Sequence, residues 1–389
     1  MMRMNLRHLF QVFPKGVLHG LAIKANPLVE VLRQAVECGA GLEAASWEEV
    51  QIARAAGCEP SSIVFNSAVK TSEELEGALA MGVLINANSL DELHRISDII
   101  QERFPVSRIG LRINPRVGAG TIKTTSVATD RSWFGVPLEQ ADRIVAAFRH
   151  YPWLAGLHVH VGSQSCSLEQ MTGGVVQIQR LRERIENELG AGRLCFMDIG
   201  GGLPACYREG NTPPTPGEYL QLLHERVPEL FGAGVRLITE FGRWVQAGSG
   251  WAVSRIEWVQ PVPHPTVGVH LGADFLLRPA YQPEAWSHEF LVLDPTGTIK
   301  SGQMSSWTIA GPLCFGGDII ARNALLPSPQ PGDFLVIRDT GAYALGLWSR
   351  HCSRGIPLVL GVDSGVVSVL REAETGEDVA RFWSRASWK

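Results

Sequence analysis

The sequence lacks the features that mark membrane, exported and nucleic-acid-binding proteins. No apolar run is long enough to span a membrane, and the net charge of −4 comes without a block of basic residues. The start of the chain is not a secretory signal, because its apolar residues are broken by Gln11, Pro14 and Lys15. The seven cysteines are odd in number and form no Cys-x-x-Cys pair, which argues against a disulfide framework and a structural zinc site. We therefore expect a cytoplasmic protein that binds neither membranes nor nucleic acids.

The length of 389 residues is too great for one small core and predicts two domains, which we place at residues 1–250 and 251–389. In the first domain, short apolar runs alternate with longer amphipathic stretches, which predicts parallel strands joined by helices. Eight such units in roughly 250 residues favour a (β/α)₈ barrel. The expected strands are Leu18–Ile23, Gly41–Ala45, Ile63–Asn66, Val83–Ala87, Arg108–Ile113, Gly156–Val161, Cys195–Ile199 and Arg236–Thr239. Among the expected helices are Leu28–Glu37, Trp47–Ala56, Ser72–Met81 and Leu90–Glu102, with Ser72 capping the third of these.

The carboxyl ends of barrel strands carry the functional groups in this fold. Here the first strand ends in Lys24, and an unpaired lysine is costly to bury unless its pKa falls, which also makes it a nucleophile for aldehydes. The strand ends taken together offer a lysine, an imidazole, a glycine triplet, an acid and an arginine. The residues are Lys24, Glu43, Ser46, Asn66, Asn86, Asn88, Arg112, Asn114, His160, Ser163, Asp198, Gly200, Gly201, Gly202, Glu240 and Arg243.

Several of these groups suit a phosphorylated, ring-containing cofactor. The triplet Gly200-Gly201-Gly202 offers bare backbone amides that can wrap a phosphate, and Arg243 supplies a charged partner for it. Glu240 could keep a pyridinium nitrogen protonated. Of the two histidines in His158-Val159-His160, we expect only one to face the lumen, with His160 stacking on a flat ring and the other as a packing residue.

Four motifs, in this order, resemble the fold-type III pyridoxal-phosphate decarboxylases, a family that includes the diaminopimelate, ornithine and arginine decarboxylases. They are Ala22-Ile23-Lys24-Ala25-Asn26-Pro27, His158-Val159-His160-Val161-Gly162-Ser163-Gln164, Asp198-Ile199-Gly200-Gly201-Gly202 and Glu240-Phe241-Gly242-Arg243. The likeness runs from about Leu18 to Val362. It implies pyridoxal 5'-phosphate as the cofactor and the two-domain architecture of alanine racemase, with a β-domain after the barrel.

The resemblance also implies roles for single residues. Lys24 would form the Schiff base with the cofactor, His160 would stack on its ring, and Glu240 would contact the pyridine nitrogen. The phosphate side would be held by Ser163, Gly200, Gly201, Gly202, Arg243 and Tyr343, with further cofactor contacts at Glu43, Arg112 and Gly242. Cys314 would act as a general acid from the partner subunit of a homodimer with shared active sites. Substrate contacts are expected at Arg278, Phe315, Asp318 and Tyr343.

The region after Gly250 changes to short runs of β-forming residues punctuated by proline and glycine, which predicts an antiparallel β-domain. The expected strands are Trp251–Val259, Thr266–Leu271, Phe290–Leu293, Trp307–Ile309, Phe334–Ile337, Pro357–Val362 and Val366–Leu370.

The sequence also departs from the family pattern. Phe315 stands after the family cysteine, where the family commonly has an acid that meets the distal ammonium of the substrate. Phe241 replaces a proline, and Tyr281 lies one residue early after Arg278-Pro279, so its role stays open. The chain begins close to Lys24, and we expect that the N-terminus is shortened or that the native start lies upstream.

We therefore expect a pyridoxal-phosphate-dependent decarboxylase of an amino acid or an amino-acid conjugate, with neither the substrate nor its stereochemistry specified. One alternative is a racemase-like or non-catalytic protein that holds the same cofactor. Another is a metal-dependent barrel hydrolase built on His158 and His160, which we disfavour because no third and fourth ligands are evident.

Overall fold

The computed structural model describes residues 1–100, 107–208, 210, 212–232 and 234–384. The chain forms two compact units, one of residues 1–205 and 212–246, the other of residues 206–211 and 247–389. The division after Gln246 falls just before the expected boundary at residue 250. Within the described residues, no helix has the length and apolar character needed to cross a membrane.

The first unit is a closed barrel of eight parallel strands, as the sequence predicts. The strands are β1 (Leu18–Ala22), β2 (Gly41–Ala44), β3 (Ile63–Phe65), β4 (Leu84–Ala87), β5 (Ile109–Asn114), β7 (Leu154–His158), β8 (Phe196–Asp198) and β9 (Arg236–Thr239). They run in the order β4-β3-β2-β1-β9-β8-β7-β5, and a further pairing of β4 with β5 closes the sheet. A two-residue strand, β6 (Val136–Pro137), pairs in parallel with the carboxyl end of β5.

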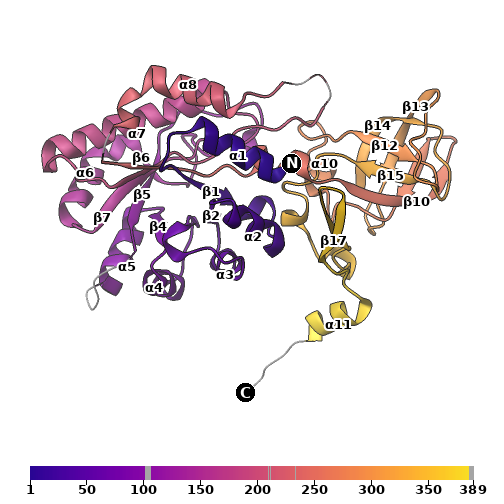
Figure 1. Ribbon diagram of the computed structural model, residues 1–389, viewed down its shortest axis with the longest axis horizontal. Helices are drawn as coiled ribbons and strands as arrows, with labels where there is room; N and C mark the ends of the chain where they lie inside the picture. Colours follow the sequence, from indigo (N-terminus) through magenta and orange to yellow (C-terminus); the bar gives the residue numbers. More distant parts are fainter. Residues whose placement is uncertain (101–106, 209, 211, 233, 385–389) are drawn as a thin grey trace. The chain divides into compact units, whose positions relative to one another are not determined.

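Helices cover the outside of the barrel (Figure 1). They are α1 (Met2–Val12), α2 (Val29–Glu37), α3 (Trp47–Ala55), α4 (Ser72–Met81), α5 (Leu90–Ile100), α6 (Ala141–His150), α7 (Leu168–Leu189), α8 (Pro216–Arg226) and the short α9 (Arg243–Gln246). The expected end of α5 at Glu102 lies outside the described residues. Thr71, not Ser72, caps α4, because the Thr71 hydroxyl accepts from the Glu74 N–H while the Glu74 carboxylate accepts from the Thr71 N–H.

Two separate apolar clusters stabilise the barrel. The larger one lies between the strands and the surrounding helices. The smaller one comes from residues of five different strands that meet inside the barrel, namely Leu18, Val64, Leu84, Phe196 and Ile238. The Phe196 ring fits there because the neighbouring strands carry glycine: a Cβ at Gly156 or Gly110 would lie 2.3 or 2.8 Å from the ring. This packing closes one end of the lumen and leaves the other to polar side chains.

The second unit is built mainly of antiparallel strands. A six-stranded sheet runs in the order β12-β15-β10-β11-β13-β14, in which only the β11–β13 pairing is parallel among the described strands. Its strands are β10 (Ala252–Gln260), β11 (Thr266–Val269), β12 (Phe290–Leu293), β13 (Met304–Ala310), β14 (Ile319–Pro327) and β15 (Phe334–Ile337). A hairpin of β16 (Val359–Asp363) and β17 (Val366–Arg371), with helices α10 (Leu277–Tyr281) and α11 (Gly376–Ser384), completes the unit.

Strand β14 was not expected from the sequence. Its polar residues interrupt the alternation of buried and exposed positions, and Asn323 has a φ of +57° where the register against β13 shifts. A bulge of this kind hides a strand from a period-two pattern.

Candidate active site

Lys24 lies in a single 3₁₀ turn, Ile23–Ala25, directly after β1. Its ammonium forms an ion pair with the Glu43 carboxylate of the neighbouring strand β2, which is fully buried. Burial raises the pKa of Glu43 to about 7, although the charge of Lys24 acts in the opposite direction. The Lys24 side chain itself is 38% exposed, so a ligand can reach the amine from solvent.

Two buried carboxyl groups lie at the ends of adjacent strands, Asp198 on β8 and Glu240 after β9. They share a hydrogen bond, and burial together with the charge of Glu240 raises the pKa of Asp198 well above its ordinary value. Burial also opposes ionisation of Glu240, but His158 and Lys24 outweigh it and hold the pKa of Glu240 below its ordinary value. Asp198 is therefore the protonated member of the pair and Glu240 the charged one.

Side chains from other strands hold this pair in place. The Asn66 amide donates to the two Glu240 oxygens at 3.1 and 3.4 Å, and His158 Nε2 lies 3.4 Å from Glu240 Oε2. On the other side, Asn86 donates to Asp198 Oδ2 at 3.0 Å, and the Gly200 N–H donates to Asp198 Oδ1 at 3.0 Å. The charged oxygen atoms of Glu240 are thus fixed at the carboxyl end of the barrel.

The expectation that only one of the two histidines faces the lumen is wrong. His158 contacts Glu240 directly, and His160 accepts a hydrogen bond from the Gly201 N–H after β8. The physical reason is that residues two positions apart along a strand lie on the same face, so His158 and His160 point the same way.

His160 is held in one tautomer by the glycine triplet. Its Nδ1 accepts a hydrogen bond of 3.1 Å from the Gly201 N–H. Burial lowers the pKa of His160 to about 3, so the ring is neutral and its proton is on Nε2. A neutral, oriented imidazole is suited to lie against a flat aromatic ring.

The glycine triplet is sterically required. Gly200 and Gly202 have φ values of +68° and +118°, and a Cβ at Gly201 would lie 2.1 Å from the Glu240 carbonyl oxygen. Two of the three amides are already used, because Gly200 donates to Asp198 and Gly201 donates to His160. The triplet therefore contributes a close-packed turn more than a set of bare amides.

The remaining predicted residues of the barrel lie around this centre. Arg243 Nε donates to the Ser163 hydroxyl at 3.2 Å, which brings together two of the groups expected to hold a phosphate. Gly242 packs against the turn of Lys24, since its Cβ would lie 2.9 Å from the Ala22 Cβ. Arg112 is buried, and burial lowers its pKa to about 10 although Glu240 and Glu43 act the other way.

In the second unit, Cys314 and Phe315 lie in the segment between β13 and β14. Phe315 stacks on Tyr281 with a centroid distance of 6.1 Å and meets the His351 ring edge-on at 5.6 Å. Cys314 is exposed and free of any disulfide.

Asp318 fixes this segment through hydrogen bonds to its backbone. Its two carboxylate oxygens accept the backbone N–H groups of Ala273 and Leu313, both at 2.6 Å, and the residue is buried. Both oxygens are thus engaged with backbone, which gives Asp318 a positioning role for the loop that carries Cys314.

A second group in this unit combines a cation with two aromatic rings. The Arg278 guanidinium lies 4.2 Å from the centre of the Tyr343 ring and 4.6 Å from that of Trp286. Tyr343 has a φ of +59°, an unusual conformation for a residue with a side chain. The structure thus brings together Arg278 and Tyr343, two of the residues expected to bind substrate or cofactor.

Sequence analysis placed Asn66, Asn86 and Asp198 among the polar strand ends but assigned them no role, and it treated His158 as a packing residue. Their positions at strand ends were the available signal. It also missed that His158, Asp198 and Glu240 bring potential ligand atoms within 4.8 Å of one another, the arrangement that a metal site needs.

Comparison with known proteins decides between these chemistries. Residues 3–247 match the family model of the pyridoxal-dependent decarboxylases, pyridoxal binding domain. The chain belongs to this family. It is 31% identical to diaminopimelate decarboxylase of Methanothermobacter thermautotrophicus, over 96% of this chain and 84% of the relative. It is 30% identical to that of Pseudomonas aeruginosa, over 92% of this chain and 84% of the relative.

Solved structures agree. A diaminopimelate decarboxylase from Helicobacter pylori complexed with L-lysine has a TM-score of 0.87 and 27% identity, covering 98% of this chain and 93% of that one. The chain is thus a pyridoxal-phosphate-dependent amino-acid decarboxylase, and the metal-dependent hydrolase is ruled out by its family. The same comparison favours decarboxylation over the racemase-like and non-catalytic alternatives.

The residues of this pyridoxal-dependent decarboxylase fit the cofactor on structural grounds. The lumen holds an accessible amine at Lys24 and a charged carboxylate at Glu240. It also holds buried polar atoms without a hydrogen-bond partner among the described residues, Glu43 Oε1 and His158 Nδ1. An amine for an aldehyde and a carboxylate for a pyridinium nitrogen are the two groups that this chemistry requires.

Proposed function

We propose that the barrel residues contact different parts of the cofactor. Lys24 binds the cofactor covalently through its amine, and Glu240 accepts a hydrogen bond from the protonated ring nitrogen. His160 would lie against the ring, while Ser163 and Arg243 would hold the phosphate beside the close-packed glycine turn. The cofactor, when bound, supplies an electron sink that accepts the electron pair left by the departing carboxylate.

The observation that carries this proposal is the set of contacts around the buried Glu240 carboxylate, made by Asn66 and His158. Glu240 is ionised although it is buried, because Asn66 donates to it and His158 and Lys24 lie nearby. Asp198 keeps its proton and shares it with Glu240 in a hydrogen bond, so Glu240 acts as an acceptor only. An acceptor of this kind keeps a ring nitrogen protonated, which is the state that withdraws electrons.

We further propose that the protein works in the cytoplasm as a homodimer, in which each active site takes Cys314 from the partner. The Cys314 thiol would deliver a proton to the substrate carbon after carbon dioxide leaves. Its exposed position on a loop fixed by Asp318 supports this role, as do the seven free cysteines for a reducing compartment.

The substrate we propose is an amino acid whose far end is neutral or anionic. Phe315 stacks on Tyr281 where the family pattern places an acid, so this position cannot neutralise a distal ammonium. Arg278, which lies against the Tyr343 and Trp286 rings, would meet an anionic far end. Another arginine of this unit, Arg350, donates to both carboxylate oxygens of Glu374 and is committed to that ion pair.

Carbon dioxide release from a panel of amino acids tests the substrate proposal. The wild-type enzyme should turn over meso-diaminopimelate, lysine and ornithine poorly compared with amino acids that have a neutral or carboxylate far end. Phe315→Glu should raise turnover of meso-diaminopimelate, whereas the matched control Phe315→Leu, which adds no charge, should not. Efficient turnover of ornithine by the unmodified enzyme would refute the proposal.

A further inference from the structure

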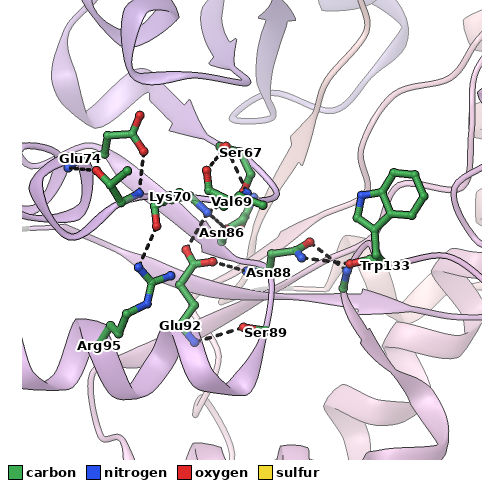
Figure 2. A network of polar contacts seen from close by, with 12 residues as sticks. Ser67, Val69, Lys70, Glu74, Asn86, Asn88, Ser89, Glu92, Arg95 and Trp133 are labelled. Carbon is green, nitrogen blue, oxygen red and sulfur yellow. Dashed lines mark hydrogen bonds and ion pairs between the residues drawn. The ribbon is translucent and has the colours of Figure 1, made fainter.

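A buried ion pair lies behind the site and takes no part in the chemistry proposed above. Lys70, after β3, is fully buried, and its ammonium donates to three acceptors (Figure 2). They are Glu92 Oε1 at 2.7 Å and the carbonyl oxygens of Ser67 and Asn86, each at 2.8 Å. All three donor positions of the ammonium are thus filled, and the ends of β3 and β4 are tied to α5.

The same ion pair fixes Asn88, the residue after β4. The second Glu92 oxygen accepts from the Asn88 N–H at 3.2 Å. The Asn88 amide in turn contacts the loop that follows β5: Nδ2 donates to the Trp133 carbonyl at 3.1 Å (Figure 2), and Oδ1 accepts from the Gly135 N–H at 2.9 Å. Asn88 therefore holds the backbone on both sides of Phe134.

The segment held by Asn88 lies directly on β5. Gly135 has a φ of +77°, and a Cβ there would lie 2.9 Å from the Ile113 carbonyl carbon and 3.0 Å from the Arg112 carbonyl oxygen. Between the two clamped residues, the Phe134 ring lies against the Arg112 guanidinium, with 4.6 Å from Cζ to the ring centre. The contact is a cation–π interaction at a buried arginine, where such contacts are strongest.

Arg112 is a buried cation of the site, on which the charges of Glu240, Glu43 and Asp198 act. Six charged or titratable groups act on it or are acted on by it, and they lie on five strands or after them: Glu43, Lys70, His158, His160, Asp198 and Glu240. A shift of its guanidinium would change the field at every one of them.

We propose that Asn88 is a positioning residue for the cofactor site, acting on Arg112 through Phe134, with the Lys70–Glu92 ion pair as its anchor. The expected effect on cofactor binding rests on the proposed function, whereas the positioning of Arg112 concerns only residues of this chain. Asn88 itself does not reach the reacting atoms. It sets where Phe134 lies, and Phe134 sets where Arg112 lies.

Asn88→Ala in the full-length holoenzyme is the test, with Ser89→Ala as the matched control. The Ser89 hydroxyl accepts the Glu92 N–H at the start of α5, so its loss removes a hydrogen bond of the same network but leaves the clamp on residues 133 and 135 intact. Asn88→Ala should weaken binding of pyridoxal 5'-phosphate about tenfold and alter the visible circular dichroism of the bound cofactor. Ser89→Ala should do neither.

Phe134 provides the second arm. Phe134→Leu should reproduce the cofactor affinity and the spectrum of Asn88→Ala. Phe134→Tyr, which keeps the aromatic face, should retain the affinity and the spectrum of the wild type. The double variant Asn88→Ala with Phe134→Leu should be no weaker than either single one, because both changes break one path. Additive losses, or a Ser89→Ala enzyme as impaired as Asn88→Ala, would overturn the proposal.

A measurement without cofactor separates this inference from the proposed function. In cofactor-free protein labelled with ¹⁵N-arginine, the Phe134 ring should shift the Arg112 Nε–H signal upfield, with Arg112→Lys used to assign it. Asn88→Ala should abolish the shift and Ser89→Ala should keep it. Asn88→Asp, which retains the acceptor for Gly135 but loses the donor to Trp133, should give an intermediate shift and serves if the alanine variant does not fold. An unchanged signal in the Asn88 variants refutes the positioning role, whereas a failure of the wild-type protein to bind the cofactor refutes the proposed function alone.

Discussion

Replacing Glu92 by glutamine should destabilise the protein strongly, although Glu92 touches no substrate. Lys70 and Glu92 have side chains that are 0% and 2% exposed, and their charged atoms lie 2.7 Å apart. The substitution can keep the side-chain acceptor at position 92 but leaves the Lys70 ammonium buried without a counter-charge. Breaking a buried pair in this way costs about 3–5 kcal/mol, a large share of the roughly 5–15 kcal/mol that stabilises a typical domain.

An exposed ion pair of the same chain gives the scale for comparison. Arg381 and Glu377 lie 3.1 Å apart, but their side chains are 68% and 83% exposed. Glu377→Gln should therefore change the free energy of unfolding by less than about 1 kcal/mol. Because both variants make the same chemical change, the difference between them reports the burial of the charge.

The assay is urea unfolding followed by tryptophan fluorescence, with the midpoints compared at one pH and one salt concentration. A second variant, Lys70→Met combined with Glu92→Gln, removes the buried cation and should recover at least part of the lost stability. A Glu92→Gln protein within about 1 kcal/mol of wild type would contradict the inference that this pair anchors the loops after β3, β4 and β5.

Three further predictions follow from the site. Burial raises the pKa of Glu43 to about 7, above the value of about 4.3 in an unfolded chain. Between these values the unfolded state holds fewer protons, so stability falls as pH rises through this window. The difference in melting temperature between cofactor-free wild type and Glu43→Gln should therefore shrink from about pH 5 to pH 7, and a constant difference would oppose this. Asp318→Ala leaves two buried N–H groups without acceptors and should cost about 3 kcal/mol in urea unfolding, whereas little change would show that the loop is held by other contacts. If Cys314 comes from the partner subunit, mixing Lys24→Ala with Cys314→Ala protein should make about half of the dimers mixed and restore roughly a quarter of wild-type activity; a mixture that exchanges subunits and stays inactive would refute the shared site.

The barrel could be predicted from the sequence because each strand is a short apolar run, and longer amphipathic stretches typical of helices lie between the runs. The strand Arg236–Thr239 was predicted with its observed bounds, and Phe290–Leu293 in the second unit likewise. The polar groups at strand ends followed from the same pattern, since parallel strands bring their carboxyl ends to one side of the sheet.

What could not be predicted depends on which side chains meet across the lumen. Asp198 looked like one polar residue among many, and its role as the protonated partner of Glu240 depends on a contact between neighbouring strands that spacing does not reveal. The clamp of Asn88 on residues 133 and 135 is similar, because it joins the ends of two strands through a loop with no periodic pattern. The error over His158 and His160 had a different origin, since the spacing of two residues already places them on one face.

The central claim is that Lys24 is the residue that binds the cofactor covalently. Reduction of the purified holoenzyme with borohydride, followed by digestion and mass spectrometry, tests it directly. The account predicts that the pyridoxyl group is recovered on the peptide that carries Lys24, and that Lys24→Ala protein, which lacks the amine, yields no labelled peptide. Recovery of the label on any other lysine, Lys70 included, would contradict the account.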